Sequence, residues 1–333
     1  MILIVSDRAD QQIYHVMLEL EELGARFGLF NAGDFPSRTT LRQSVTSATE
    51  TCELELEDGS LTDASRIEAV WYRKPRRPRF HHKVGVHERE YVYHEAVAGL
   101  AGLYEALRDA YWISPLENMR AASNKLEQLR RARRLGFTIP DSLFTNSREL
   151  ARTFFRSTRA EGNVIVKSIG EPALYERAGS WDPGSVVGEL FTTIVDDEIA
   201  DILIERLEAG PALFQRYVPK SHELRVTLVE DRIFAAEIDS QVEERSRVDW
   251  RRGDALELPH QECKLPEVVA DRCRRLSRSY GLRYSAIDLI VDEGGNYVFL
   301  EINPNGQYGW LEAKTPLRIS RAIAECLHQR GDS

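Results

Sequence analysis

Three oxygen-bearing side chains near the end of the sequence, Asp288, Glu301 and Asn303, have the types and spacing of a metal site. No basic residue lies beside them in the sequence. Carboxylates in apolar runs are costly to bury unless a cation or hydrogen bonds compensate. Hard oxygen ligands suit Mg²⁺ beside a phosphate-bearing substrate. The pattern therefore favours a magnesium site, and the alternative is a polar sheet edge that faces solvent.

A β-hairpin is the element that would bring these three side chains together. Two apolar runs flank the segment 292–296, whose Asp, Gly and Asn residues tolerate left-handed backbone. Pairing Asp292 with Tyr297 would place Asp288 opposite Glu301. Because side chains alternate along a strand, the amide two residues further on shares the face of the glutamate.

Three basic residues occur at positions where an anion could bind. Lys167 lies within a β-branched run, where its ammonium must reach water or meet an anion. Lys125 opens a predicted helix directly after Asn124, which has the pattern of an N-terminal cap, and such a lysine alone is typical of a solvated helix start. Arg225 lies in an alternating strand, where it could bind phosphate oxygens. Its alternative is a structural salt bridge to an acid on the same or the next strand, Glu223 or Glu237.

Composition excludes several classes of protein. The chain has 333 residues, enough for two or three packed units, with 42% apolar and 29% charged residues. A net charge of −9 argues against a nucleic-acid binder. Four scattered cysteines indicate neither a zinc site nor disulfides, and they favour a reducing cytoplasm. We see no signal peptide and no run of the about 20 apolar residues that a membrane span needs.

The first part of the chain is predicted to be a parallel-sheet scaffold. Residues 2–6 and 26–31 have the pattern of buried strands, and residues 10–23 that of the helix between them. The first turn lacks the glycines of a dinucleotide site. A further strand runs into five basic residues between positions 73 and 79. These could form a solvated loop, a nucleic-acid patch, or a basic rim facing a phosphate or an acidic peptide.

The remaining segments alternate between helices and strands. Residues 196–209 are predicted to form a helix whose first turn is acidic, which alone would stabilise the helix dipole. Residues 213–220 have the pattern of a strand that leads into a linker, and residues 267–280 that of a helix that leads into the hairpin. Four histidines fit no zinc spacing and are expected on the surface: His81, His82, His87 and His94.

A family resemblance joins these features. The Asp…Glu-x-Asn pattern resembles the metal motif of the ATP-grasp ligases, and the tail EINPNGQYGWLE resembles the maturases of microviridin-type (graspetide) peptides. The string WYRKP at 71–75 is similar to an element of the same maturases. The implied fold is α/β, with an N-terminal parallel-sheet (pre-ATP-grasp) domain and two α+β lobes enclosing ATP. The implied boundaries are 1–115, 116–212 and 213–333.

The resemblance also implies the roles of individual residues. Lys125 and Lys167 would contact ATP phosphates, and Arg225 would lie near the transferred phosphate. Asp288, Glu301 and Asn303 would hold Mg²⁺. Arg251 or its neighbour Arg252 would face an acyl phosphate. The backbone at the adenine edge would come from the hinge segment Gln215, Arg216, Tyr217 and Val218. The chain departs from many family members because its glycines after Lys167 are well separated: Gly170, Gly179 and Gly184.

The implied reaction is activation of an Asp or Glu side chain by ATP, followed by attack of a Ser/Thr hydroxyl or a Lys amine. The implied substrate is a ribosomally made precursor peptide with a leader. Arg73 is the candidate substrate contact in the basic run. Asp196 and Asp197 are either leader contacts or helix caps. We further expect a cytoplasmic homodimer that binds neither nucleic acid nor membrane.

Two alternatives stay open from the sequence. One is a carboxylate–amine ligase that acts on a free amino acid or a protein tail. The other is a regulatory protein that binds a nucleotide without catalysis. The sequence does not decide between ester and amide products.

Overall fold

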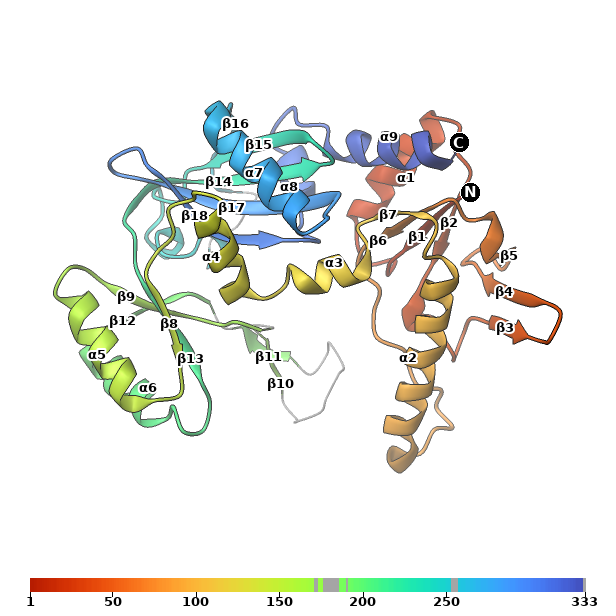
Figure 1. Cartoon of the computed structure of the whole chain (residues 1–333), viewed down its shortest axis with the longest axis horizontal. Helices are drawn as coiled ribbons and strands as arrows, with labels where there is room; N and C mark the ends of the chain where they lie inside the picture. Colours follow the sequence, from red (N-terminus) through yellow and green to blue (C-terminus); the bar gives the residue numbers. More distant parts are fainter. Residues whose placement is uncertain (171–172, 176–185, 190, 253–256, 332–333) are drawn as a thin grey trace.

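The computed structural model describes residues 1–170, 173–175, 186–189, 191–252 and 257–331. Three groups of elements are visible in Figure 1: an N-terminal group, a small middle group and a C-terminal group around a five-stranded sheet. The two ends of the chain lie on the same side of the molecule, where α1 and α9 pack together. Among the described residues, no helix is long and apolar enough to span a membrane.

The N-terminal group is built on a parallel sheet of order β2-β1-β6-β7, which confirms the predicted scaffold. The first strand is apolar and fully buried because helices cover parallel sheets. A three-stranded antiparallel sheet, β3-β4-β5, lies beside it. The elements are β1 (Ile2–Val5), α1 (Gln12–Glu22), β2 (Phe27–Phe30), β3 (Leu41–Val45), β4 (Glu50–Glu55), β5 (Leu61–Asp63), β6 (Ala69–Tyr72), α2 (Arg89–Ala106) and β7 (Tyr111–Ile113). The four histidines lie exposed in or near α2, as expected.

The middle group is an antiparallel sheet of order β12-β9-β13-β8 with two helices on one face. Its own hydrophobic cluster is formed by residues of α5, α6 and the sheet. The side chain of Ser147 caps α5 by accepting a hydrogen bond from the amide of Leu150. The elements are β8 (Ser142–Thr145), α5 (Arg148–Arg159), β9 (Val164–Lys167), β10 (Ala173–Tyr175), β11 (Val186–Glu189), β12 (Thr193–Val195), α6 (Asp197–Glu205) and β13 (Ala212–Arg216).

The C-terminal group is an antiparallel sheet of order β16-β15-β14-β17-β18. Its elements are β14 (Lys220–Val229), β15 (Arg232–Ile238), β16 (His260–Glu262), α7 (Glu267–Ser279), β17 (Tyr284–Asp292), β18 (Tyr297–Asn303), α8 (Gly309–Glu312) and α9 (Ile319–Gly331). On β14, Leu224, Val226 and Leu228 enter the main hydrophobic cluster. The alternation predicted for this strand is confirmed, and its other face carries the polar residues of the site.

Two short helices connect the N-terminal group to the rest, α3 (Leu116–Ala121) and α4 (Lys125–Arg134). The Asn124 side chain accepts hydrogen bonds from the amides of Leu126 and Glu127, so the predicted cap is confirmed. The apolar side of α4, including Leu129 and Ala132, packs on the C-terminal sheet rather than on the middle sheet. Lys125, the first residue of α4, is therefore positioned by the C-terminal group, which also contains the β17–β18 hairpin.

Candidate active site

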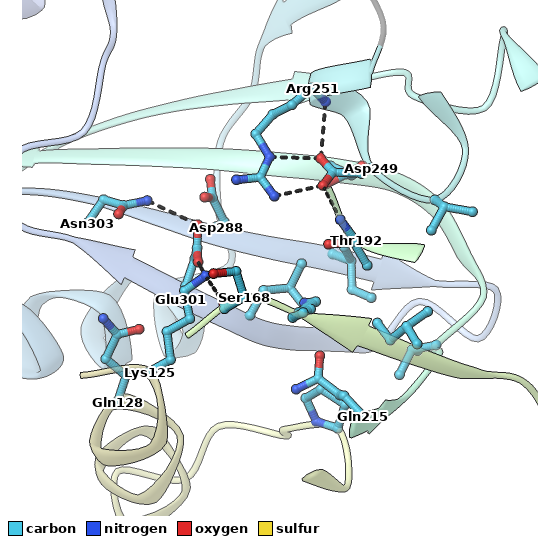
Figure 2. Close-up of a pocket in the computed structure, with 18 of the residues that line it drawn as sticks. Lys125, Gln128, Ser168, Thr192, Gln215, Asp249, Arg251, Asp288, Glu301 and Asn303 are labelled. Carbon is cyan, nitrogen blue, oxygen red and sulfur yellow. Dashed lines mark hydrogen bonds and ion pairs between the residues drawn. The ribbon is translucent and has the colours of Figure 1, made fainter. Parts of the chain in front are cut away.

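A pocket of about 440 Å³ lies between the middle sheet and the C-terminal sheet. Ten of the residues predicted from the sequence line it, and Figure 2 shows how several of them converge. They are Lys125, Lys167, Gln215, Arg216, Tyr217, Val218, Arg251, Asp288, Glu301 and Asn303.

Asp288 and Glu301 lie opposite one another on β17 and β18, as predicted, but the register differs from the predicted one. Tyr297 pairs with Val291 instead of Asp292. A β-bulge between Asp288 and Leu289 then shifts the register by one residue and restores the predicted pair. The amide of Asn303 donates to Glu301 Oε1 over 3.1 Å, which joins the third side chain to the pair (Figure 2).

Each carboxylate of the hairpin has a cation supplied from elsewhere in the chain. Arg225 Nη1 on β14 donates to both oxygens of Asp288, over 2.7 and 2.9 Å. Lys125 Nζ on α4 lies 3.3 Å from Glu301 Oε2 and donates to the carbonyl of Ser168 over 3.0 Å (Figure 2). Arg225 pairs with Asp288 and not with Glu223 or Glu237, the acids named in the alternative interpretation. The site is therefore a network of paired charges, which burial requires.

The two carboxylates respond to burial differently. Burial and the neighbouring Glu301 raise the pKa of Asp288 despite Arg225. Burial also opposes ionisation of Glu301, but Lys125, Arg251 and Lys167 together hold its pKa below the usual value. Burial lowers the pKa of Lys167 to about 8, with Lys125 adding repulsion. Within the described part of the chain, no hydrogen-bond or ion-pair partner meets the Lys167 ammonium. A partly buried cation that no described residue pairs with favours an anionic ligand in such a pocket.

Comparisons with known proteins place this site in a family. The family described as the MvdD pre-ATP grasp domain matches residues 1–120. The macrocyclase MdnC of Microcystis aeruginosa MRC, solved with precursor peptide MdnA, is 31% identical, with a TM-score of 0.84 over 98% of this chain and 99% of that one.

This chain belongs to the microviridin-type ATP-grasp ligases.

Two further solved structures agree. A Chryseobacterium gregarium RiPP-associated ATP-grasp ligase, in complex with ADP and a leader and core peptide, is 28% identical, with a TM-score of 0.88 over 100% of this chain and 98% of that one. Macrocyclase MdnB of Microcystis aeruginosa MRC is 29% identical, with a TM-score of 0.79 over 98% of each chain. No curated protein matches the chain. The predicted family, ATP-grasp fold, ligase activity and use of ATP are confirmed.

The ligase also contains pocket residues that the sequence did not reveal. Asp249 is buried and accepts two hydrogen bonds from the Arg251 guanidinium, over 2.8 and 2.7 Å, and one from the amide of Thr192 over 3.2 Å (Figure 2). Burial opposes its ionisation, but the hydrogen bonds of Arg251 lower the pKa of Asp249 to about 2. The only signal in the sequence for this ion pair is the Asp-x-Arg spacing of Asp249 and Arg251. That spacing indicates an ion pair only when both side chains are known to be buried. Arg252 instead donates to the Thr192 carbonyl over 3.0 Å.

Two more unpredicted residues are a buried ion pair, Lys220 and Glu223, 2.7 Å apart on β14. A third is Gln128 on α4, which binds that helix to β18, the strand that carries Glu301 and Asn303. Its amide donates to the Ile302 carbonyl over 2.8 Å, and its oxygen accepts from the Ile302 amide over 3.2 Å. Gln128 therefore fixes Lys125, one turn earlier, relative to Glu301.

The hinge segment, Gln215 to Val218, lies where the middle sheet meets the pocket. The amides of Arg216 and Tyr217 already donate to the carbonyls of Asp141 and Asn163, over 2.8 Å each. The side chain of Gln215 donates to Ser142 over 2.8 Å, while its own oxygen is buried without a partner in the described chain.

Three candidate substrate residues lie outside the pocket lining. Asp196 caps α6 by accepting from the Ile199 amide over 2.8 Å, and both Asp196 and Asp197 are exposed. Arg73 is 1% exposed and contacts the segment after β18. Two of the well-separated glycines that follow Lys167 in the sequence, Gly179 and Gly184, lie outside the described residues.

Proposed function

We propose that this ligase forms ester or amide crosslinks within a ribosomally made precursor peptide by activating its Asp or Glu side chains. The observation that carries the proposal is the pocket itself: Lys167, which has no ion-pair partner among the described residues, lines it together with a hairpin whose two carboxylates are already matched by Arg225 and Lys125. Such a site has spare positive charge for a polyphosphate. The solved relatives bound to precursor or leader peptides support a peptide as the acceptor.

The proposed chemistry has two steps. A peptide carboxylate oxygen attacks the terminal phosphorus of ATP, and the bond to ADP breaks, which leaves an acyl phosphate. A Ser/Thr hydroxyl or Lys amine of the same peptide then attacks the acyl carbon and loses its proton, and inorganic phosphate leaves. No side-chain nucleophile of the enzyme is needed. The contribution of the protein is fixed positive charge, with Lys125 and Lys167 at the nucleotide phosphates and Arg225 and Arg251 at the transferred one.

The oxygen donors of the hairpin fit Mg²⁺ that shares its coordination with phosphate. Among the described residues, no cluster of three or more His, Cys, Asp or Glu side chains could hold a metal by itself. Asp288, Glu301 and the amide oxygen of Asn303 offer an incomplete set, and Mg²⁺ commonly completes such a set with substrate phosphates and water. When bound, the ion would neutralise charge on the phosphate oxygens.

Other features belong to the same proposal. For the division at 1–115, 116–212 and 213–333, the separate cluster of the middle part is a support, whereas α4 packs with the third part and one cluster joins α1 and the first sheet to α9 and the C-terminal sheet. The backbone of Gln215–Val218 would meet the adenine, and within the described chain the amide of Val218 has no hydrogen bond that competes. We also propose that the enzyme is cytoplasmic and homodimeric, and that Asp196 and Asp197 contact the leader.

The test is reconstitution with a precursor peptide encoded beside this gene, chosen for acidic and Thr- or Lys-rich repeats. Purified enzyme with ATP and Mg²⁺ should release one ADP for each water lost from the peptide, measured by mass spectrometry. Detection of AMP and pyrophosphate would instead indicate adenylation. A free amino acid that replaces the peptide as substrate would favour the carboxylate–amine ligase, and no turnover with either would favour a nucleotide-binding regulator.

A further inference from the structure

Arg73, at the end of β6, is buried in the N-terminal group yet holds a loop of the C-terminal group. Its Nη1 donates to the backbone carbonyl and the side-chain oxygen of Asn305, over 2.7 Å each, and to the carbonyl of Gly306 over 3.1 Å. Its Nε donates to Asp10 over 3.1 Å. The Asn305 side chain donates back to the Arg73 carbonyl. The two residues are 232 positions apart, so this contact ties the two ends of the chain together.

The loop held by Arg73 begins two residues after the ligand Asn303 and also holds Arg225. The carbonyl of Gln307, the next residue after Gly306, accepts from Arg225 Nη2 over 2.9 Å. Arg225 uses its other terminal nitrogen for Asp288. The Arg73 guanidinium therefore binds the loop to the N-terminal group, and the Arg225 guanidinium connects the same loop to Asp288 of the β17–β18 hairpin.

The loop packs too closely to move without moving Arg225. A side chain at Gly306 would place its first carbon 2.9 Å from Arg225 Nη2 and 2.5 Å from the Ala286 methyl. The Gly306 carbonyl also accepts from the Tyr284 hydroxyl over 2.7 Å. Burying a guanidinium is costly unless its donors are satisfied, so Arg73 is an expensive residue for a simple interdomain contact. An apolar residue could fill the same space, but it could not donate hydrogen bonds that orient the carbonyls of Asn305 and Gly306.

We propose that Arg73 is a positioning residue: it acts through the loop 305–307 to hold the Arg225 guanidinium in place for the transferred phosphate. This rests on the proposed function, because that function gives Arg225 its role. It replaces the expectation that Arg73 itself touches the peptide.

The first experiment compares Arg73→Lys with the matched control Arg76→Lys. Arg76 lies in the same basic run and is half-exposed. Its ion-pair partner is Asp7, 2.8 Å away, which belongs to the N-terminal group and not to the loop 305–307. Since small misplacement of a reacting group can cost about a hundredfold, Arg73→Lys should lower kcat by about ten- to a hundredfold with little change in the KM for peptide. Arg76→Lys should leave both constants unchanged. A raised peptide KM at wild-type kcat would make Arg73 a substrate contact and overturn the inference.

A second measurement does not depend on turnover. Calorimetry with Mg²⁺ should show that Arg73→Lys weakens AMPPNP, which carries the terminal phosphate, more than ADP, which lacks it. General destabilisation would weaken both alike and would overturn the inference. If Arg73→Lys does not fold, Asn305→Ala removes one acceptor of the same contact and should give the same selective loss.

A double-mutant cycle with Arg225→Lys completes the test. If Arg73 acts through Arg225, its substitution should cost less than about threefold in kcat once Arg225 has been changed. Independent, multiplicative losses would contradict the inference. If the wild-type enzyme makes no crosslinked product, the proposed function has failed. If the wild type does but the cycle is additive, only the role of Arg73 has failed.

Discussion

Two basic regions of this ligase, the pocket and the run at 73–79, contain the same residue types but have different roles. In the pocket, Lys125 and Arg225 pair with acids that themselves face the cavity. In the run at 73–79, Arg76 lies 2.8 Å and Arg79 lies 3.6 Å from Asp7 of the scaffold. The surroundings of the acids differ: Asp288 and Glu301 line the pocket between the middle and C-terminal sheets, whereas Asp7 follows β1 and lines, with Arg79, a separate and smaller cavity of the N-terminal group. The first pairs therefore lie within the candidate active site, and the second pairs hold the basic run on the scaffold. A count of basic residues in the sequence cannot distinguish these cases.

The largest effect should come from the acid that completes the pocket. Glu301→Gln removes one charged oxygen from the site and leaves Lys125 without its partner. Loss of a group that stabilises transition-state charge typically costs about 3 kcal/mol, so turnover should fall at least about a hundredfold. Far-UV circular dichroism should show a folded protein. Near wild-type product formation in Mg²⁺ would rule out the hairpin as the metal site.

A matched control for Glu301 lies in the N-terminal group, outside the run at 73–79. Glu57 pairs with Arg8 over 2.6 Å at the edge of the N-terminal group. Glu57→Gln removes a carboxylate of the same type, and kcat should stay within about twofold because Glu57 does not line the pocket between the two sheets.

The second effect concerns a positioning acid. Asp249→Asn should loosen the two hydrogen bonds that orient Arg251 and so lower kcat by about tenfold, since one charged hydrogen bond is worth about 1.5–3 kcal/mol. The matched control is Asp7→Asn, which loosens Arg76 and Arg79. It should lower the melting temperature and leave kcat unchanged. Equal kinetic losses in both variants would show that the distinction between the two regions is wrong.

What the sequence could predict follows from local periodicity. The hairpin, the Asn124 cap and the alternation of β14 depend on neighbours in the chain, and all three were predicted. The prediction that Asp288 lies opposite Glu301 is correct although the pair from which it was counted, Asp292 with Tyr297, is not. A β-bulge between the two ends of the hairpin compensates for the error of one residue. Sequence periodicity does not reveal where one extra residue is inserted.

The residues that were missed depend on contacts between distant segments. Asp249 matters because its carboxylate reaches Thr192 in the middle sheet, and Gln128 because it bonds to Ile302, 174 positions away. The alternative interpretation of Arg225 named Glu223 and Glu237 but not Asp288 for the same reason, because the strand of Asp288 lies beside β14 only in the folded sheet. Local patterns predict elements, but they do not predict which strand comes to lie beside which.

The third effect tests the unpaired lysine. With a pKa of about 8, Lys167 is about half protonated at pH 8 in the free enzyme. A bound phosphate favours the charged form and raises this pKa, so nucleotide binding near pH 8 should take up a fraction of a proton. The KM for ATP should therefore rise as pH increases above 8.

Calorimetry of AMPPNP binding in two buffers with different ionisation enthalpies measures the proton directly. Lys167→Met should abolish the uptake and weaken AMPPNP. Proton uptake that persists in Lys167→Met would assign it to another group and remove Lys167 from the phosphate site.

The smallest effect concerns α6, where the acidic first turn has two possible roles. Asp196 is the helix cap, and Asp197 is exposed beside it. A long leader must be held away from the chemistry, because each crosslink site differs while the leader stays the same, and such remote binding orients the reacting end. If these acids contact the leader, the double change Asp196→Ala, Asp197→Ala should weaken a labelled leader peptide about tenfold, as expected for a charged hydrogen bond worth about 1–3 kcal/mol. ATP binding should change little.

Capping alone predicts a different result, and single variants separate the two roles. Asp197→Ala leaves the cap in place, so any loss of leader affinity in that variant comes from the peptide contact. Ser147→Ala removes the corresponding cap of α5, where the Leu150 amide donates to Ser147 over 3.3 Å. A lost cap costs about 0.5–2 kcal/mol of stability. Ser147→Ala should therefore lower the melting temperature to a similar degree as the α6 double variant while keeping leader affinity. Dissociation constants that are equal in the wild type, the double variant and Asp197→Ala, compared at matched folded fraction, would leave the acidic turn with capping as its role.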